Sequence, residues 1–414
     1  MRHHGLSVAV IGGGIGGLSA GLSLLQAGLD VHVYEQSSRI SEVGAGIAVS
    51  PNATRILYRL GLECELARTG VRPTAWWQRR WDDGRTLSRT PLGTEIEKRF
   101  GSPHYQMHRG DLVAALARAF PAGRLHTGHR LLSLVDDGDS VEARFENGET
   151  TRADVVVGAD GIHSAVRAAL FGPETPHFTG CVAYRGVIPA ARLPHLDMEP
   201  AIQLWMGPNS HFIHYHVSGL RLVNVVGVIE QNTWTKESWT EPGDVADLLA
   251  AYDHWHPQVR AILQTFEETF RWAIFERSPM PRWSRGRVTI LGDACHAMLP
   301  FLAQGAAQAM EDGVTLAALL SNLGSPAEVP EALRTYESVR RPRVTRVQRM
   351  ASDNKARLHM PDGPAQQARD AELANGTTDI FFSAWEWLYR HDPEAARTQT
   401  YRTDLHRNRN RDPA

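Results

Sequence analysis

The chain has 414 residues, more than one hydrophobic core normally organises, and we therefore expect two domains. Its 42% hydrophobic and 22% charged residues exclude a disordered chain, and its formal net charge of −2 excludes the strong positive field that a nucleic-acid or anionic-lipid partner would need. Cys64, Cys181 and Cys295 have neither disulfide-framework nor metal-site spacing, which favours a reducing, cytoplasmic location. We expect no membrane span and no signal peptide, because no apolar run is long enough or free enough of glycine.

A strand, a glycine-rich turn and a helix open the chain. Residues 6–11 form a short apolar run typical of a buried parallel strand, residues 18–27 have helical spacing, and residues 31–35 form the next strand. The turn reads G-x-G-x-x-G, in which glycine permits a tight turn, close approach of a pyrophosphate, and close helix–strand packing. Glu35 ends the second strand, where a carboxylate can accept hydrogen bonds from the ribose of an adenosine. The unit predicts a site for the ADP part of FAD or NAD, held by Gly12, Gly14, Ile15, Gly17, Glu35 and Gln36.

Two later apolar runs, residues 153–158 and 287–292, are similar to the first strand, and each is followed by an aspartate. We expect them to belong to the same parallel sheet, although they are far apart in the sequence. Between them, residues 179–229 contain segments that alternate apolar and polar side chains, which is typical of an antiparallel sheet. A second domain is therefore predicted to be inserted into the first. Helices are predicted at residues 306–320, 329–350 and 379–388.

Two further motifs follow the later parallel strands. Residues 160–167 read D-G-x-x-S-x-V-R, and residues 292–296 read G-D-A-C-H, followed by Pro300 and Gly305. An aspartate in such a place is, by itself, most often a helix N-cap. Together with the glycine-rich turn, and in this order, the motifs make the chain resemble the class A flavoprotein monooxygenases, the family of para-hydroxybenzoate and salicylate hydroxylases. The resemblance covers residues 6–350.

The resemblance implies an α/β fold with a Rossmann-like FAD-binding domain of the GR2 type, an inserted antiparallel-sheet substrate domain and C-terminal helices. We expect the FAD-binding domain in three parts, residues 1–72, 98–177 and 280–350. The substrate domain is expected in two parts, residues 73–97 and 178–279, and residues 351–414 are expected to form a helical tail.

The resemblance also implies FAD as the bound cofactor and NADH or NADPH as a transient co-substrate, since only one dinucleotide fingerprint is present. In this family the segment that contains Asp160 serves FAD and the passing nicotinamide, and Asp293 holds the ribityl and pyrophosphate part. The helix after Gly305 is expected to point its positive end at the flavin pyrimidine ring and stabilise negative charge there. The expected FAD contacts beyond the first turn are Ala48, Arg109, Leu131, Asp160, Asp293, Pro300, Gly305 and Ala306.

A histidine-rich strand, residues 211–216, carries the predicted catalytic groups. Alternation along a strand puts His211 and Tyr215 on one face and His214 and His216 on the other. The latter two could form a metal pair. A functional metal needs a third or fourth ligand, however, and the sequence offers no clear candidate, so we predict no metal site.

The resemblance places His211 and Tyr215 in the substrate pocket. A phenol becomes electron-rich when it loses its proton, so we expect His211 to take that proton and Tyr215 to orient or relay it. His104 and Arg185 are further pocket candidates, Arg185 as the partner of a substrate carboxylate. For each of them an ordinary structural role stays open as the alternative.

The predicted activity is hydroxylation of the ring of a hydroxybenzoate-type acid (salicylate, 3-hydroxybenzoate or an amino-hydroxybenzoate) with NAD(P)H and O2, through a flavin hydroperoxide. Ala48 stands where 6-hydroxynicotinate hydroxylases carry His, which argues against that substrate. Pro300 stands where 3-hydroxybenzoate 6-hydroxylases carry Gln and salicylate-type enzymes carry Pro. Two alternatives stay open: an FAD-dependent oxidase or reductase on the same fold, and a non-catalytic flavin-binding regulator. We expect a monomer or homodimer whose partners are the small aromatic acid and O2.

Overall fold

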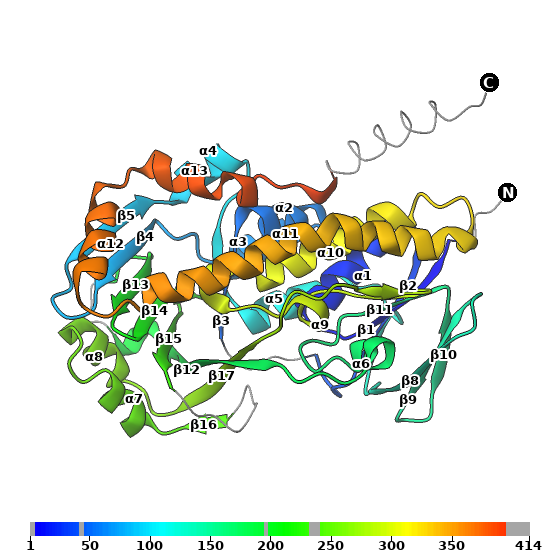
Figure 1. Cartoon of the computed structure of the whole chain (residues 1–414), viewed down its shortest axis with the longest axis horizontal. Helices are drawn as coiled ribbons and strands as arrows, with labels where there is room; N and C mark the ends of the chain where they lie inside the picture. The colour runs from blue at the N-terminus through cyan, green and yellow to red at the C-terminus, as the bar shows by residue number, and fades with distance from the viewer. Residues whose placement is uncertain (1–4, 41–44, 194–197, 232–240, 395–414) are drawn as a thin grey trace.

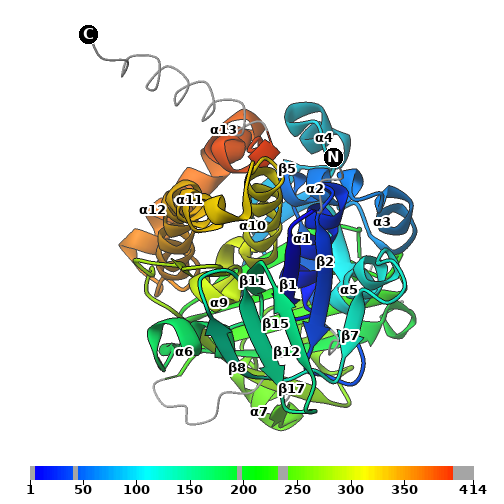
Figure 2. The ribbon, with the colours of Figure 1, turned by 90° about the vertical axis from the view of Figure 1, so that its right-hand side faces the viewer.

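The computed structural model describes residues 5–40, 45–193, 198–231 and 241–394. Within them, a six-stranded sheet forms one end of the molecule (Figure 1, Figure 2). Val8 pairs with Val155 and Val156 pairs with Val288, so the predicted assembly of three distant strands into one parallel sheet is confirmed. The order of its strands is β18 (Ser284–Arg285), β19 (Val288–Ile290), β11 (Val155–Gly158), β1 (Ser7–Ile11), β2 (Asp30–Glu35) and β7 (Leu125–Thr127).

Helices α1 (Ile15–Gln26) and α10 (Gly305–Leu320) pack closely against each other beside this sheet (Figure 2). A Cβ at Gly313 would stand 2.6 Å from the Cα of Ala20, and a Cβ at Gly16 would stand 3.1 Å from the Cβ of Ala309. Glycine at both contacts lets the two backbones approach. Because residue numbers rise in the same direction along both helices, the helices are parallel and their amino-terminal ends lie together.

An eight-stranded sheet forms the other end of the molecule (Figure 1). Its neighbouring strands are antiparallel, as predicted for the inserted domain, except that β4 and β13 are parallel. This exception arises because β4 and β5 come from an earlier part of the chain and are added to the edge of the later strands. The order is β16 (Glu241–Gly243), β17 (Thr269–Glu276), β12 (His177–Pro189), β15 (Leu222–Glu230), β14 (Ser210–Val217), β13 (Ile202–Gly207), β4 (Ala75–Arg80) and β5 (Thr86–Pro91).

Two smaller sheets and several shorter helices complete the fold. A three-stranded sheet has the order β10 (Thr150–Ala153), β9 (Val141–Phe145) and β8 (Leu131–Asp136), and a two-stranded sheet contains β3 (Gly46–Val49) and β6 (Tyr105–His108). The shorter helices are α2 (Pro51–Arg59), α3 (Glu63–Thr69), α4 (Gly93–Phe100), α5 (Arg109–Arg118), α6 (Ala165–Phe171), α7 (Val245–Ala251), α8 (Pro257–Leu263), α9 (Asp293–His296), α12 (Pro364–Asn375) and α13 (Thr378–Tyr389). Short 3-10 turns occupy Ala190–Arg192, Pro300–Leu302 and Pro326–Glu328.

One long helix, α11 (Val329–Leu358), runs along the molecule from the six-stranded sheet to the eight-stranded sheet (Figure 1). It continues past residue 350, where the sequence predicted the tail to begin, and α12 and α13 follow it. Residues 395–414 of that predicted tail lie outside the described residues. No helix of the described part, α11 included, is long and apolar enough to cross a membrane.

A buried cluster of charges joins α10 to α11. Arg340 of α11 donates through Nη1 to Glu311 Oε2 at 2.6 Å and through Nε to Asp312 Oδ1 at 2.7 Å. Arg343 donates to both carboxylate oxygens of Glu311. Burial by itself would raise the pKa of the Glu311 carboxyl, but the positive charges of Arg340 and Arg343 outweigh it and lower this pKa to about 2. The cluster therefore consists of ionised groups that are paired with one another.

The same carboxylates reach the loops at the amino-terminal end of α10. Glu311 Oε1 accepts a hydrogen bond from Asn52 Nδ2 at 2.8 Å, and Asn52 Nδ2 also donates to Gln304 Oε1 at 3.2 Å, directly before α10. Asp312 Oδ2 accepts from the backbone N–H of Gly292 at 3.1 Å. The charged cluster thus positions α2, the loop before α9, and the start of α10.

The variant Arg340→Met should lower the free energy of unfolding by about 3–5 kcal/mol, because an apolar side chain leaves Glu311 and Asp312 buried with too little positive charge. The exposed ion pair Arg334–Glu331 on the same helix supplies the control. Arg334→Met should change the same free energy by less than about 0.5 kcal/mol. Urea denaturation followed by circular dichroism measures both, and equal effects of the two variants would contradict the role assigned to Arg340.

Candidate active site

The glycine-rich turn lies at the carboxyl end of β1 and begins α1. Gly12 has φ +115°, and a Cβ there would overlap the carbonyl of Ala159, so only glycine fits. A Cβ at Gly17 would overlap the carbonyl of Gly12. At Gly14, by contrast, a Cβ would meet no protein atom within 4 Å. Gly12 and Gly17 therefore serve the packing of the protein itself, whereas Gly14 borders open space, as expected of the glycine that a pyrophosphate approaches.

Glu35 lies directly beside this turn. Its Oε2 accepts a hydrogen bond from the backbone N–H of Gly13 at 2.6 Å. Its backbone carbonyl accepts from the N–H of His129 at 2.8 Å, which brings the residues before Leu131 to the end of β2. Gln36 is exposed next to it. The predicted contacts Glu35, Gln36 and Leu131 thus gather at one edge of the six-stranded sheet.

The amino-terminal ends of α1 and α10 have no side-chain cap, the N-cap residues being Gly14 and Gln304. Such ends leave backbone N–H groups free to bind an anion or a partly negative ring. Asp293 lies near the second end, because a Cβ at Gly305 would stand 3.9 Å from Asp293 Oδ1. Ala306 follows in the first turn of α10. Two parallel helix ends and a carboxylate between strand and helix fit a ligand that carries phosphates, hydroxyls and an electron-accepting ring.

Arg109 begins α5 and donates its backbone N–H to the carbonyl of Ala45 at 2.8 Å. Burial lowers the pKa of the Arg109 guanidinium, and the negative charge of Asp293 opposes this shift. The two predicted FAD contacts are therefore close enough to act on each other electrostatically, although they are distant in the sequence.

Asp160 has a structural role in the loop before α6. Its Oδ1 accepts from Ser164 Oγ at 2.6 Å and its Oδ2 accepts from the N–H of Val166 at 3.1 Å. The ordinary alternative for this aspartate in the sequence was a helix N-cap; the N-cap residue of α6 is Ser164, and Asp160 binds both Ser164 and the first turn of the helix. The backbone of Asp160 also lies against the glycine-rich turn, because a Cβ at Gly12 would stand 2.9 Å from its nitrogen. A contact of Asp160 with FAD stays a prediction.

The inner face of the eight-stranded sheet carries the predicted catalytic side chains. His211, Ile213 and Tyr215 alternate along β14, which pairs with β15 over its whole length. Arg185 of β12 and Ile213 of β14 both stand opposite Val226 of β15. Directly opposite residues of antiparallel strands share one face of a sheet. Arg185, His211 and Tyr215 therefore lie on the same face, as the alternation predicted for the two residues of β14.

His214 lies on the opposite face. Its Nε2 accepts a hydrogen bond from Trp205 Nε1 at 3.2 Å, and Trp205 belongs to the apolar cluster that α7 and α8 cover. Burial, and then the charges of His216 and Arg79, lower the pKa of His214 to about 3. This ring is a neutral hydrogen-bond acceptor in the core.

Strands β3 and β6 pair with each other and lie against the inner face of the sheet. The N–H of Gly46 donates to Asn224 Oδ1 at 2.6 Å, and a Cβ at Gly46 would stand 2.6 Å from the hydroxyl oxygen of Tyr215. Ala48, two residues later, pairs with Gln106 of β6. The short strand thus brings the predicted flavin neighbour Ala48 close to the predicted catalytic Tyr215.

Three buried polar atoms around β3 have no hydrogen-bond partner among the described residues: His104 Nδ1, Gln106 Oε1 and Asn224 Nδ2. Each such atom costs about 1–3 kcal/mol while it stays unpaired. His104 Nε2 lies 2.9 Å from Gln106 Nε2, and burial lowers the pKa of His104 to about 4, so the ring is neutral. Unpaired buried donors and acceptors in one place are typical of a site that a polar ligand completes.

Arg185 is buried close to Arg109. Burial first, and the positive charge of Arg109 second, lower the pKa of Arg185 to about 10. Two buried guanidinium groups that repel each other make a nearby anion favourable. The position therefore suits the carboxylate of an aromatic acid, the role that the sequence suggested for Arg185.

His211 is 5% exposed and contacts side chains from other parts of the fold. Its Nδ1 lies 2.7 Å from Nε2 of His359, the residue after α11, and His359 Nδ1 lies 2.9 Å from Glu230 Oε1 at the end of β15. The ring of Phe301, next to Pro300, contacts both histidines edge-on. Burial and the neighbouring His359 lower the pKa of His211 well below its usual range, which keeps the ring neutral, as a general base requires.

His359 and Glu230 were missed by sequence reasoning. Neither belongs to a motif, and His359 is 148 positions away from His211. The helical pattern before His359 was the one signal available. The sequence predicted the end of that helix at residue 350, whereas α11 continues to Leu358 and brings His359 to His211.

A hollow of about 620 Å³ lies elsewhere, between residues 279–281 and α11. It contains none of the predicted site residues, so the candidate site is defined by its polar groups and not by this hollow. Its lining residues are Pro279, Met280, Pro281, Arg341, Pro342, Thr345, Arg346, Arg349 and Met350.

Comparison with known proteins agrees with this geometry. Residues 5–351 match the family described as FAD binding domain. A 3-amino-4-hydroxybenzoate 2-monooxygenase of Streptomyces platensis, PtmB3, is 40% identical over 382 residues, which cover 92% of this chain and 95% of that protein. A 6-hydroxynicotinate 3-monooxygenase of Bordetella bronchiseptica is 40% identical over 350 residues, covering 84% and 91%. The solved structure of a salicylate hydroxylase substrate complex is similar with a TM-score of 0.80 at 26% identity, covering 95% of this chain and 98% of that one. The chain therefore belongs to the FAD-binding family of aromatic-ring monooxygenases.

Proposed function

We propose that this chain uses FAD, NADH or NADPH, and O2 to hydroxylate the ring of a hydroxybenzoate-type acid, with an amino-hydroxybenzoate as the first candidate. One observation carries the proposal. The sheet face with His211 and Tyr215 meets β3 beside Ala48, on the side where Arg109 and Asp293 lie. The first candidate follows from the relative that is named 3-amino-4-hydroxybenzoate 2-monooxygenase and is 40% identical.

In this proposal FAD lies along the carboxyl edge of the six-stranded sheet. Gly14 and Glu35 hold its ADP half, Asp293 and Arg109 hold the middle, and the N–H groups at the start of α10 face its ring. When bound, FAD accepts a hydride from the nicotinamide and activates O2 for transfer to the aromatic ring. Further contacts with FAD are proposed for Gly12, Ile15, Gly17, Gln36, Ala48, Leu131, Asp160, Pro300, Gly305 and Ala306.

His211 is the proposed acceptor of the phenolic proton. Its ring is buried and neutral, and removal of the phenol proton makes the aromatic ring electron-rich enough to attack an activated oxygen. Burial raises the pKa of the Tyr215 hydroxyl, so Tyr215 keeps its proton and donates a hydrogen bond that orients the substrate. Arg185 is the proposed partner of the substrate carboxylate. The neutral ring of His104 is proposed to supply a polar group at the edge of the substrate pocket.

The two rival functions need less of this arrangement. An FAD-dependent oxidase or reductase needs no proton acceptor for a phenol, and a flavin-binding regulator needs no reacting group. The buried, neutral His211 on the face that meets β3 favours the monooxygenase. Three finer points belong to the same proposal: the six-part division of the chain into domains, a cytoplasmic location, and a monomeric or homodimeric state.

Turnover with a panel of aromatic acids tests the function. At least one of salicylate, 3-hydroxybenzoate and 3-amino-4-hydroxybenzoate should stimulate NADH or NADPH consumption in air and yield a product one oxygen atom heavier by mass spectrometry. The primary amides of the same acids should have a higher KM, because Arg185 then faces no carboxylate. Consumption that no aromatic acid stimulates, or that yields only hydrogen peroxide, would favour the oxidase instead.

Removal of the Asp293 carboxylate tests the FAD site. Asp293→Ala should weaken FAD binding roughly ten- to hundredfold, because a flavin hydroxyl loses its acceptor at a cost of about 1–3 kcal/mol. The control is Asp139→Ala in the exposed turn between β8 and β9, which should bind FAD as tightly as the parent. Flavin fluorescence during titration of the apoprotein gives both dissociation constants. Unchanged affinity in Asp293→Ala would mean that this motif does not hold FAD.

Removal of the His211 ring tests the base. His211→Ala should bind FAD and be reduced by NAD(P)H like the parent, whereas product formation should fall by about 10²–10⁴-fold, with hydrogen peroxide formed in its place. His211 stays neutral well below pH 6.5, so the parent should keep its coupling as the pH falls through that value. The measurement is the ratio of product to NADH consumed. A fully coupled His211→Ala variant would remove His211 from the reaction.

A further inference from the structure

We propose that His211, His359 and Glu230 form a relay that carries the phenolic proton from the buried ring site to an exposed carboxylate, with His359 and Glu230 as positioning residues that act through His211. This inference rests on the proposed function, since it extends the role of His211. It assigns a use to two residues that lie outside every motif of the sequence.

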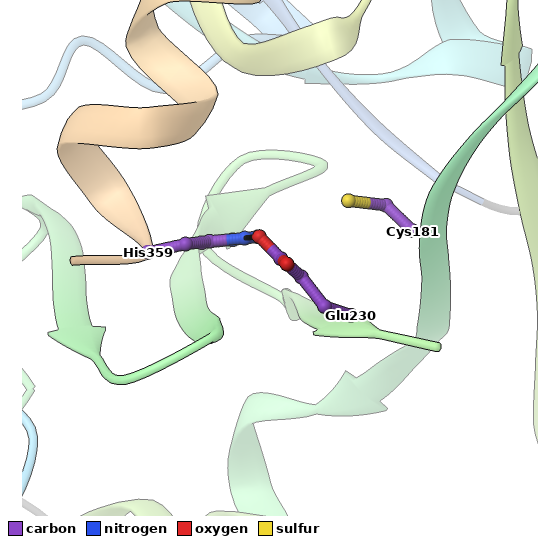
Figure 3. A group of neighbouring side chains, drawn as sticks. All are labelled: Cys181, Glu230 and His359. Carbon is purple, nitrogen blue, oxygen red and sulfur yellow. Dashed lines mark hydrogen bonds and ion pairs between the residues drawn. The ribbon is translucent and has the colours of Figure 1, made fainter. Parts of the chain in front are cut away.

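The three side chains form a continuous chain of short contacts from three different elements. His211 Nδ1 lies 2.7 Å from His359 Nε2, and His359 Nδ1 lies 2.9 Å from Glu230 Oε1. Figure 3 shows the His359 ring pointing at the Glu230 carboxylate from the end of α11. His211 comes from β14 and Glu230 from the last position of β15. Both distances are those of hydrogen bonds along which a proton can move.

The carboxylate determines which nitrogen of each ring carries a proton. A carboxylate only accepts hydrogen bonds, so His359 Nδ1 must carry a proton and donate it to Glu230. A neutral His359 then has a lone pair on Nε2, which requires His211 Nδ1 to donate. A neutral His211 therefore has its own lone pair on Nε2. This nitrogen has no partner within the part of the chain that the structure describes, and it is the atom that can accept the substrate proton.

The proton balance of the relay is complete. The phenol O–H bond breaks and a proton joins His211 Nε2, while the proton on His211 Nδ1 passes to His359 Nε2. The proton on His359 Nδ1 passes to Glu230, which releases it to water. The phenol is left as phenolate, both rings are neutral again in their other tautomers, and reprotonation of the product reverses the steps. No electron pair leaves the protein and no further reactant is needed.

Burial along the chain of contacts gives the relay its direction. His211 is 5% exposed and His359 is 3% exposed, whereas Glu230 is an exposed residue. Phe301 covers both rings edge-on, with centroids 5.3 Å and 5.7 Å away. Water therefore reaches this chain at its Glu230 end. Burial lowers the pKa of His359, and the hydrogen bond to Glu230 opposes that shift, which favours transient protonation of the middle ring.

The backbone holds the relay in place. The N–H of Asn209 donates to the carbonyl of His359 at 3.0 Å, and the N–H of Glu230 donates to the carbonyl of Asn209 at 2.9 Å. The hydroxyl of Tyr252 donates to the carbonyl of His211 at 3.0 Å. All three members are therefore fixed by hydrogen bonds of their own main chain, as a preorganised proton path requires.

A metal site is the alternative interpretation of the side chains around His359. Cys181, Glu230 and His359 offer ligand atoms that all lie within 4.8 Å of one another (Figure 3). The ammonium of Lys355, however, lies 3.9 Å from Glu230 Oε1 and hydrogen-bonds to the carbonyl of Thr179 at 2.8 Å. A positive charge already beside the carboxylate disfavours a cation. Burial also raises the pKa of the Cys181 thiol, which disfavours the thiolate that a metal prefers.

Ionisation of a bound phenol in the oxidised enzyme tests the relay without turnover. The probe is 3-amino-4-hydroxybenzoate, whose phenolate is followed by ultraviolet difference absorbance from pH 5 to 9. His359→Gln keeps a polar side chain but cannot pass a proton, and Glu230→Gln removes the final acceptor. Both should raise the pH of half-ionisation by at least about one unit and slow hydroxylation roughly 10- to 100-fold. Imidazole should restore part of the ionisation in His359→Ala.

The controls separate the relay from a structural effect. His216→Gln lies on the opposite face of the same strand, and Cys181→Ala removes a titratable neighbour that the relay does not use; both should ionise the phenol as the parent does. Lys355 is the other charged group that faces Glu230 and is kept in every variant. FAD content and circular dichroism identify a variant that fails to fold, and Glu230→Gln, at the exposed end, then decides the question.

Two results would overturn the relay. One is a folded His359→Gln or Glu230→Gln variant that ionises the phenol at the parent's pH. The other is stoichiometric binding of Zn²⁺ by the parent that Cys181→Ala abolishes, which would identify a metal site. A parent that ionises the phenol but forms no hydroxylated product contradicts only the proposed function, because the titration does not depend on turnover.

Discussion

The arrangement of the molecule depends on the buried ion pairs between α10 and α11. An ionised side chain without a partner in the interior costs several kcal/mol, so these helices can pack only where Arg340 meets Glu311 and Asp312. The same two carboxylates bind Asn52 and the N–H of Gly292. The start of α10, whose free N–H groups face the proposed flavin position, is therefore set by charges that lie one or two turns further along the helix.

Helix α11 transmits this constraint to the other end of the molecule. From Arg340 to its last residue the helix rises about 27 Å at 1.5 Å per residue. His359 follows directly and meets His211 on the eight-stranded sheet. Helix α11 is held against α10, on the proposed FAD side, by the ion pairs of Arg340. The same helix is followed by His359, which positions the proposed base His211 on the substrate side. The two halves of the site are held in register by one rigid element and not by the loops between them.

Much of the fold was predictable from the sequence, because it depends on local patterns. Apolar β-branched runs marked the parallel strands, and glycine spacing marked the turn at Gly14. The candidate site was less predictable. Alternation placed His211 and Tyr215 on one face, but no pattern could reveal that His359 contacts His211, since that contact depends on the length and direction of α11. The parallel pairing of β4 with β13 likewise follows from tertiary packing.

The strand order of the six-stranded sheet has a consequence for biosynthesis. β11 lies between β1 and β19, and Val288 pairs with Val156. A ribosome must therefore make more than two thirds of the chain before this sheet can gain β19, its fifth parallel strand. Until then α10 does not cover the apolar faces of the early strands, and the edge of β11 has no partner strand. Exposed apolar surface and unpaired strand edges both favour aggregation. Contacts of such high sequence separation form slowly, so this sheet is completed later than a sheet built from one continuous segment would be.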